Sequence, residues 1–185
     1  AIWSLTYICT QNAVVFWKEF AVAERGLSDA AVGRAISLAA LVSLPLAFGA
    51  GKLLDAWGRR AGAAVIYLAL AAGVAGAYQL HGVWPLTAAL TLALFGVSAQ
   101  PAVLNTYTTE LFPTAVRGEA FGWSNNLLGR LGYVVGPALV GSAVASVGWG
   151  PAVSATAAFA LAALGLILWW MPETRGEPLE ATARH

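Results

Sequence analysis

Long apolar runs alternate with short stretches of glycine, proline and charged residues along the chain. Each run holds about twenty residues or more, the length that an α-helix needs to cross the hydrocarbon core of a bilayer. None shows the alternation of a strand, and backbone polar groups in lipid must be satisfied internally, so we expect a helical bundle. The pattern predicts an all-α membrane protein with six transmembrane helices, at residues 2–22, 31–50, 61–80, 85–107, 120–147 and 151–171.

The amino-acid composition supports contact with lipid. Hydrophobic residues make up 59% of the chain and charged residues only 10%, whereas a soluble domain usually carries about 25% charged residues. The net charge of +1 argues against a nucleic-acid partner, because such partners select an excess of basic residues. Cys9 is the only cysteine, so we expect neither an internal disulfide nor a cysteine metal cluster. We expect no cofactor.

The distribution of basic residues predicts an orientation. Residues 1–171 hold the six spans and residues 172–185 form a polar tail. Cytoplasmic loops carry an excess of lysine and arginine, so we expect a multi-pass protein of a bacterial inner membrane with its C-terminus in the cytoplasm. The chain opens at Ala1 directly in apolar sequence, which we interpret as a piece of a longer polypeptide. The expected cytoplasmic basic residues are Lys52, Arg59, Arg60, Arg117, Arg175 and Arg184, and those on the other side are Lys18, Arg25 and Arg34.

A short charged stretch, residues 51–60, separates the second and third predicted spans. It contains two glycines that can turn the chain, and a single acid, Asp55, that faces the pair Arg59 and Arg60. We therefore predict a loop here. A passive connection between two helices needs no such set of charges, so we expect this loop to belong to a moving part.

The fifth predicted span carries the strongest candidate for a binding residue. Arg130 lies at least ten residues from either end of the span, where a charge costs at least about 2.5–3.5 kcal/mol unless it faces water or a partner. It can pair with carbonyls or an acid to lock helices together, or contact an anionic substrate in a water-filled cavity. At about 100° per residue, we expect Asn126, Arg130 and Tyr133 to share a face with a stripe of glycines that admits a neighbouring helix.

Two other predicted spans have weaker polar faces. Gln11 and Asn12 lie in the first span and Asn105 in the fourth. Each of these amides can simply hold helices together, but three polar faces directed at one interior predict a cavity. The candidate substrate-binding residues are therefore Gln11, Asn12, Asn105, Asn126, Arg130 and Tyr133.

The acids and histidines argue against an enzyme. No carboxylate lies at mid-membrane depth, and Glu19, near the outer end of the first span, is the acid closest to it. A proton-coupled carrier normally uses a buried acid, so that group is either Glu19 or lies outside this chain. His81 and His185 are far apart, in a loop and in the tail. We therefore predict no catalytic residues, no metal ligands and no intramembrane hydrolase.

Three loop motifs together resemble a known family. The segment Gly51-x-x-x-Asp55-x-x-Gly58-Arg59-Arg60 is similar to the signature loop between the second and third helices of each half of major facilitator superfamily transporters. Glu110-Leu111-Phe112-Pro113-x-x-x-Arg117-Gly118 resembles the loop before helix eleven of sugar-porter-like members. Pro172-Glu173-Thr174-Arg175-Gly176, followed by Leu179-Glu180, resembles the segment that ends their helix twelve. The chain is thus identified as the C-terminal six-helix half, with helices seven to twelve.

The resemblance implies a cytoplasmic gate. In the family, charges in these loops hold the two halves together when the cavity opens outward, whereas ordinary topology charges would have no such partners. Ala56 replaces the basic residue that is usual after the loop acid, which implies a looser gate. The residues implied as gate residues are Asp55, Arg59, Arg60, Glu110, Arg117, Glu173 and Arg175.

The resemblance also implies secondary active transport of a small polar metabolite by alternating access, with protons as the coupling ion and with the missing N-terminal half as a partner. The sequence around Asn126 and Arg130 is similar to helix eleven of bacterial organic-acid symporters, and an arginine suits a carboxylate. Sugar is the alternative cargo, although Asn105 stands where sugar porters usually have a tryptophan. A transport-inactive membrane sensor and a six-helix unit that dimerises into a carrier are further alternatives.

Overall fold

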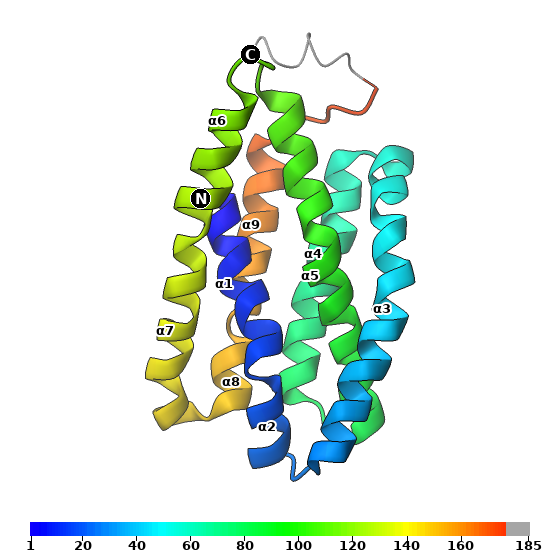
Figure 1. The fold of residues 1–185 in the computed structure, drawn as a ribbon, viewed down its shortest axis with the longest axis vertical. Coiled ribbons are helices and arrows are strands. Elements are labelled where there is room, and N and C mark those ends of the chain that lie inside the picture. Colours follow the sequence, from blue (N-terminus) through cyan, green and yellow to red (C-terminus); the bar gives the residue numbers. More distant parts are fainter. Residues whose placement is uncertain (177–185) are drawn as a thin grey trace.

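The computed structural model describes residues 1–176, which form a helical bundle (Figure 1). The predicted all-helical class is confirmed for these residues. Residues 177–185, and with them Leu179, Glu180, Arg184 and His185, lie outside the described part of the chain. The helices are α1 (Ile2–Val15), α2 (Trp17–Ala23), α3 (Asp29–Trp57), α4 (Arg59–Gln79), α5 (Val83–Leu111), α6 (Arg117–Phe121), the π-helix η1 (Gly122–Gly129), α7 (Leu131–Val147), α8 (Trp149–Ser154) and α9 (Ala157–Trp170).

Five helical stretches of residues 1–176 are long and apolar enough to cross a membrane: Asp29–Trp57, Arg59–Gln79, Val83–Leu111, Arg117–Val147 and Trp149–Trp170. The first predicted span, residues 2–22, is helical but is interrupted at Phe16 between α1 and α2. Six unbroken spans are therefore not confirmed.

The interruption at Phe16 is stabilised by α4. The Tyr78 hydroxyl donates to the backbone carbonyls of Asn12, at 3.1 Å, and Ala13, at 3.3 Å. The Trp17 indole N–H donates to the Ala77 carbonyl at 3.2 Å. Backbone groups that a helix break frees must find partners in an apolar interior, and α4 supplies them here.

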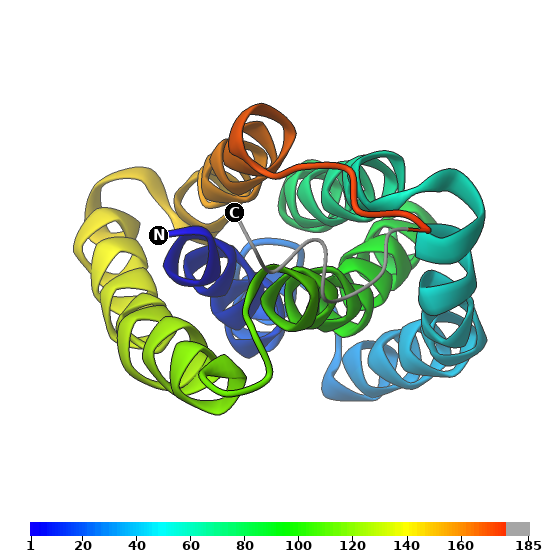
Figure 2. The same cartoon turned by 90° about the horizontal axis from the view of Figure 1, so that it is seen from above.

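The helices are arranged with α3 and α7 at opposite ends of the bundle and α1 and α5 between them (Figure 2). Helix α4 packs along α5, and α1 packs along α7 and α9. Glycine makes the α4–α5 approach possible, because a Cβ on Gly73 would lie 2.2 Å from the backbone nitrogen of Ala93 and one on Gly96 would lie 2.6 Å from Cα of Leu70. Small residues at such crossings allow the close van der Waals packing that holds membrane helices together.

Three glycines of the fifth predicted span, Gly129, Gly132 and Gly136, face α1. A Cβ on Gly132 would lie 2.3 Å from the Ser4 carbonyl oxygen, and one on Gly136 would lie 3.1 Å from the Ile8 carbonyl oxygen. Asn126 and Arg130, by contrast, are exposed. The prediction of a shared face is wrong for Asn126 and Arg130, because their side chains are exposed whereas the packed glycines lie against α1. It holds for Tyr133, which stacks on Tyr7 of α1.

The charged stretch 51–60 is mostly helical. Helix α3 continues through Trp57, and α4 begins at Arg59. Gly58 alone turns the chain, with φ of +94°, a value that residues with a Cβ rarely adopt. The predicted loop is therefore wrong over residues 51–57, because the charges extend α3 beyond its apolar part without ending the helix.

Two adjacent charged residues connect helices at the opposite end of the bundle. The Glu24 carboxylate accepts hydrogen bonds from the backbone N–H groups of Trp149 and of Gly150, the latter at 3.1 Å, at the start of α8. The Arg25 guanidinium donates to the carbonyls of Gln79, at 3.2 Å, and Leu80, at 3.0 Å, at the end of α4. An acid at a helix N-terminus and a base at a C-terminus both complement the helix dipole.

Candidate functional site

The charged cluster at the α3–α4 turn is built around the N-terminus of α4. The segment that follows α9 crosses the end of the bundle to this turn (Figure 2). There the Glu173 carboxylate accepts hydrogen bonds from the backbone N–H groups of Arg59, at 2.8 Å, and Arg60, at 3.0 Å. A Cβ on Gly58 would lie 2.8 Å from a Glu173 oxygen, so a side chain here would displace the Glu173 carboxylate, and the φ angle also favours glycine.

Arg59 connects three segments through its side chain. Its guanidinium forms a two-nitrogen contact with Glu110, with Nη2 2.7 Å and Nε 3.1 Å from Oε1, and Nη1 lies 2.8 Å from Asp55 Oδ1. The Arg59 and Glu110 side chains are only 15% and 11% exposed, whereas Asp55 is 75% exposed. The buried Thr174 hydroxyl also donates to Glu110. The cluster thus joins α3, α4, α5 and the segment after α9.

The remaining gate candidates take less part in this cluster. The Arg60 side chain donates to the Leu168 carbonyl, and Arg175 contributes its backbone N–H, 3.2 Å from Glu173. Arg117 lies apart, with Nε 3.3 Å from the Phe112 carbonyl. Of the seven predicted gate residues, Asp55, Arg59 and Glu110 meet through their side chains. Glu173 joins them through the backbone N–H of Arg59, and Thr174 is a further member that was not among the predicted gate residues.

A second polar region lies on the open face of the stretch Arg117–Val147. Asn126 and Arg130 are exposed there, and Tyr133 is 38% exposed. Arg130 lies near the middle of this 31-residue stretch, at the junction of η1 and α7. Its backbone N–H reaches back five residues to the Asn125 carbonyl, at 3.1 Å. Such wide π turns are rare and often occur at functional sites.

Two residues that the predicted site omitted hold this region in place. The Tyr7 hydroxyl on α1 donates to the Asn125 side-chain oxygen at 2.6 Å. The Tyr7 ring stacks on Tyr133, with centroids 4.3 Å apart and planes inclined by 22°. The sequence contains a signal for Asn125, since it stands beside Asn126, but only the π turn determines which of the two asparagines faces α1.

The other predicted substrate-binding residues are dispersed. Asn12 is fully buried against Gly136 and donates to the Ile8 carbonyl at 2.7 Å. Gln11 is partly buried and Asn105, on α5, is exposed. Three buried polar atoms within residues 1–176 have no hydrogen-bond partner: Asn12 Oδ1, Gln100 Oε1 and the Tyr107 hydroxyl. In the described residues, only Asn126, Arg130 and Tyr133 of the predicted set form a contiguous face.

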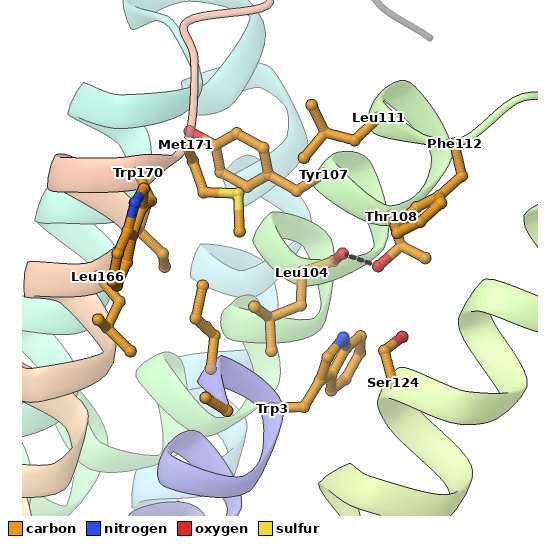
Figure 3. Close-up of a pocket in the computed structure, with 13 residues that line it drawn as sticks. Trp3, Leu104, Tyr107, Thr108, Leu111, Phe112, Ser124, Leu166, Trp170 and Met171 are labelled. Atoms are coloured by element: carbon orange, nitrogen blue, oxygen red, sulfur yellow. Dashed lines mark hydrogen bonds between the residues drawn. The ribbon is translucent and has the colours of Figure 1, made fainter. Parts of the chain in front are cut away.

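An apolar cavity of about 400 Å³ lies between the start of α1, the end of α5, η1 and the end of α9 (Figure 3). Trp3, Leu104 and Trp170 line it, and Tyr107 extends across it towards Met171. It contains none of the six predicted substrate-binding residues. Its lining includes Thr108 and Met171, but no residue of the charged cluster and neither Asn126 nor Arg130.

The comparisons with known proteins agree with the loop motifs. The sequence description of the Major Facilitator Superfamily matches residues 3–185. The chain belongs to the major facilitator superfamily. None of the curated proteins matches it by sequence.

Among solved structures, this superfamily member is similar to the inward-open conformation of the xylose transporter XylE from E. coli, with a TM-score of 0.75 and 17% sequence identity. The similarity covers 93% of the chain and 46% of that transporter, so the chain spans about half the length of the structure it matches. At this identity the likeness establishes the fold.

Glu173 is expected to make the stability of this superfamily member depend on pH. Burial by itself would raise the pKa of the Glu173 carboxyl, but the backbone N–H groups of Arg60, Arg59 and Arg175 outweigh burial and hold its pKa below the usual range. A lowered pKa contributes stability above the unfolded-state pKa of about 4.3, and this is lost as pH falls through the folded-state value.

We expect Glu173→Ala to lower the free energy of unfolding by about 1 kcal/mol at pH 7. In thermal unfolding in detergent, the difference in stability between this variant and wild type should be constant above about pH 5 and should narrow below about pH 4. A difference independent of pH would contradict this role.

The Arg59–Glu110 pair is expected to contribute more than the Arg59–Asp55 pair. Removing one partner of a mostly buried pair leaves the other charge uncompensated, so Glu110→Gln should lower the free energy of unfolding by about 3 kcal/mol. Asp55→Asn is the matched control, because it removes an exposed partner of the same arginine, and it should cost less than about 1 kcal/mol. Equal losses in thermal unfolding of the two variants would show that burial does not decide the contribution.

Proposed function

We propose that the chain is the C-terminal half of a secondary transporter that moves a small organic anion across the membrane by alternating access. The superfamily match and the XylE-like fold support a transporter, and the order of the three loop motifs supports the C-terminal half. The substrate site of such carriers lies between two six-helix bundles near the membrane midplane. The missing N-terminal half is therefore the second wall of the proposed site.

The exposed arginine in the middle of an apolar helix carries the proposal. Arg130 belongs to none of the ion pairs within residues 1–176, and it stands beside Asn126 on a face that the described residues leave open. A charge at this depth requires water or a partner. A carboxylate is a suitable partner because the guanidinium can bind it through two parallel hydrogen bonds.

The charged cluster at the α3–α4 turn is proposed to be the cytoplasmic gate. Its two ion pairs differ in exposure: the pair of Arg59 with Glu110 is mostly buried, whereas in the pair of Arg59 with Asp55 the acid is exposed. Exposed pairs contribute little individually, so they can break and re-form as the two halves rock. The positive-inside rule supports placing this end, and hence the C-terminus, in the cytoplasm of a bacterial cell.

Proton coupling is part of the proposal, and its acid is expected outside this chain. Glu19 is the candidate within the chain, and it is exposed in the first turn of α2 beside Lys18. This location, distant from the middle of a span, favours a proton-binding carboxylate in the N-terminal half. A carrier of this kind needs such a group at membrane depth.

Uptake by the full-length polypeptide in proteoliposomes tests the proposal. We expect a pH gradient, acidic outside, to drive accumulation of radiolabelled organic acids. A protonophore should abolish this accumulation, because it collapses the gradient. Accumulation of xylose or glucose instead of acids would favour the sugar alternative, which the sugar-porter-like loops around Glu110 and Glu173 support. Ligand binding without flux of any solute would favour the transport-inactive sensor.

A further inference from the structure

The open face around Arg130 contains an aromatic platform. Tyr7 is buried to 92%, with 8% exposed, and its hydroxyl is anchored on Asn125. Tyr133 stacks on it at 4.3 Å and is itself 38% exposed. One side of the Tyr133 ring therefore rests on a fixed partner, and the residue still presents surface to the open side of the bundle. A ring held in this way loses little conformational freedom when a ligand stacks on it.

The cation and the platform are one helical turn apart. Arg130 and Tyr133 are separated by three residues, which places neighbouring side chains about 5–6 Å apart at Cβ. Asn126 lies four residues before Arg130 and is exposed as well. The π turn directs Asn125 to Tyr7, as the Arg130 N–H to Asn125 carbonyl bond at 3.1 Å illustrates. The neighbouring amide of Asn126 is left for the open side.

We propose that the substrate of this face is an aromatic carboxylate, whose ring stacks on Tyr133 and whose carboxylate binds Arg130. This inference rests on the proposed organic-anion function and narrows it. The planar ring of such a ligand can stack on Tyr133, because aromatic pairs prefer offset-stacked or edge-to-face contact. Its carboxylate, which is coplanar with the ring, can bind Arg130, because a guanidinium binds carboxylate oxygens in its own plane. The Asn126 amide supplies a further donor for a ring substituent or the carboxylate.

Binding of benzoate and of cyclohexanecarboxylate to the full-length protein tests the proposal. The two acids share charge and approximate size but differ in the aromatic face. We expect wild type to bind benzoate about threefold to tenfold more tightly, the contribution of one aromatic contact. Tyr133→Leu keeps an apolar side chain and should remove the preference, whereas Tyr133→Phe should retain it. Tyr7→Phe, which frees the platform from Asn125, should reduce the preference without abolishing binding.

The outcomes separate the substrate class from the broader function. Equal affinity of wild type for both acids, or a benzoate preference that Tyr133→Leu leaves unchanged, would overturn the aromatic assignment while leaving organic-anion transport intact. Uptake of neither acid, together with uptake of a sugar, would overturn both. The Tyr133→Phe variant is the control for a folding defect, since it removes only a hydroxyl from a partly exposed residue. It keeps the aromatic ring, so it still tests whether the ring determines the preference.

Discussion

Uptake of the organic acid is expected to fall about thirtyfold or more when Arg130 is replaced by alanine. The guanidinium is proposed to bind the carboxylate through two charge-assisted hydrogen bonds, and truncating one partner of such a pair typically costs 2–5 kcal/mol. Because Arg130 is exposed and belongs to none of the ion pairs within residues 1–176, its removal should leave the melting temperature nearly unchanged. Initial uptake rates in proteoliposomes measure the loss.

Arg130→Lys is the matched variant for this prediction. Lysine retains the positive charge but cannot form the planar two-bond contact, so we expect uptake intermediate between wild type and Arg130→Ala, with the larger change in KM. Uptake by Arg130→Ala at the wild-type rate would contradict the assignment of the site. A strong loss of stability in the same variant would instead identify Arg130 as a structural residue.

The largest expected effect on stability comes from Gly73. A Cβ at this position would lie 2.2 Å from the Ala93 nitrogen, and a backbone atom of a packed helix cannot move aside without separating α4 from α5. We expect Gly73→Leu to destabilise the protein by on the order of 4 kcal/mol, at the upper end of the range for single substitutions. Thermal unfolding and the yield of monodisperse protein in detergent measure the effect.

Gly141→Ala provides the control for Gly73. No atom lies within 4 Å of the Cβ that it would add, and alanine has a higher helix propensity than glycine by about 1 kcal/mol. We expect this variant to be as stable as wild type or slightly more stable. If Gly73→Leu were tolerated as well as Gly141→Ala, the close α4–α5 approach would be wrong.

Helical fold and membrane class could be predicted from the sequence because both depend on the lengths of the apolar runs. The ends of the helices could not be predicted in the same way. The charged residues Lys52 and Asp55 end the apolar part of α3, but the helix and its hydrogen bonds continue through Trp57. The break at Phe16 was also missed. It depends on Tyr78, more than sixty residues away, whose hydroxyl satisfies the freed carbonyls.

The candidate site was predictable to the extent that charge placement determines it. Arg59 and Glu110 are predictable because their motifs occupy fixed helix ends, whereas Thr174 lies in the third motif but carries no charge, so nothing in the sequence indicates its contact with Glu110. Around Arg130, a regular period of 100° per residue placed the polar residues on the glycine face. The π turn and the packing of Gly132 on Ser4 separate the two faces, and neither follows from a helical wheel.

A substrate cavity requires that water reach the face of Asn126 and Arg130, and cysteine accessibility measures this directly. The one native cysteine, Cys9, is fully buried and can be replaced to remove background. We predict that Asn126→Cys in membrane vesicles reacts with a charged, water-soluble thiol reagent and that benzoate slows the reaction. Leu161→Cys, on the exposed apolar side of α9, should stay unreactive as a lipid-facing control. An Asn126→Cys variant as unreactive as Leu161→Cys would place this face against lipid and contradict a substrate cavity.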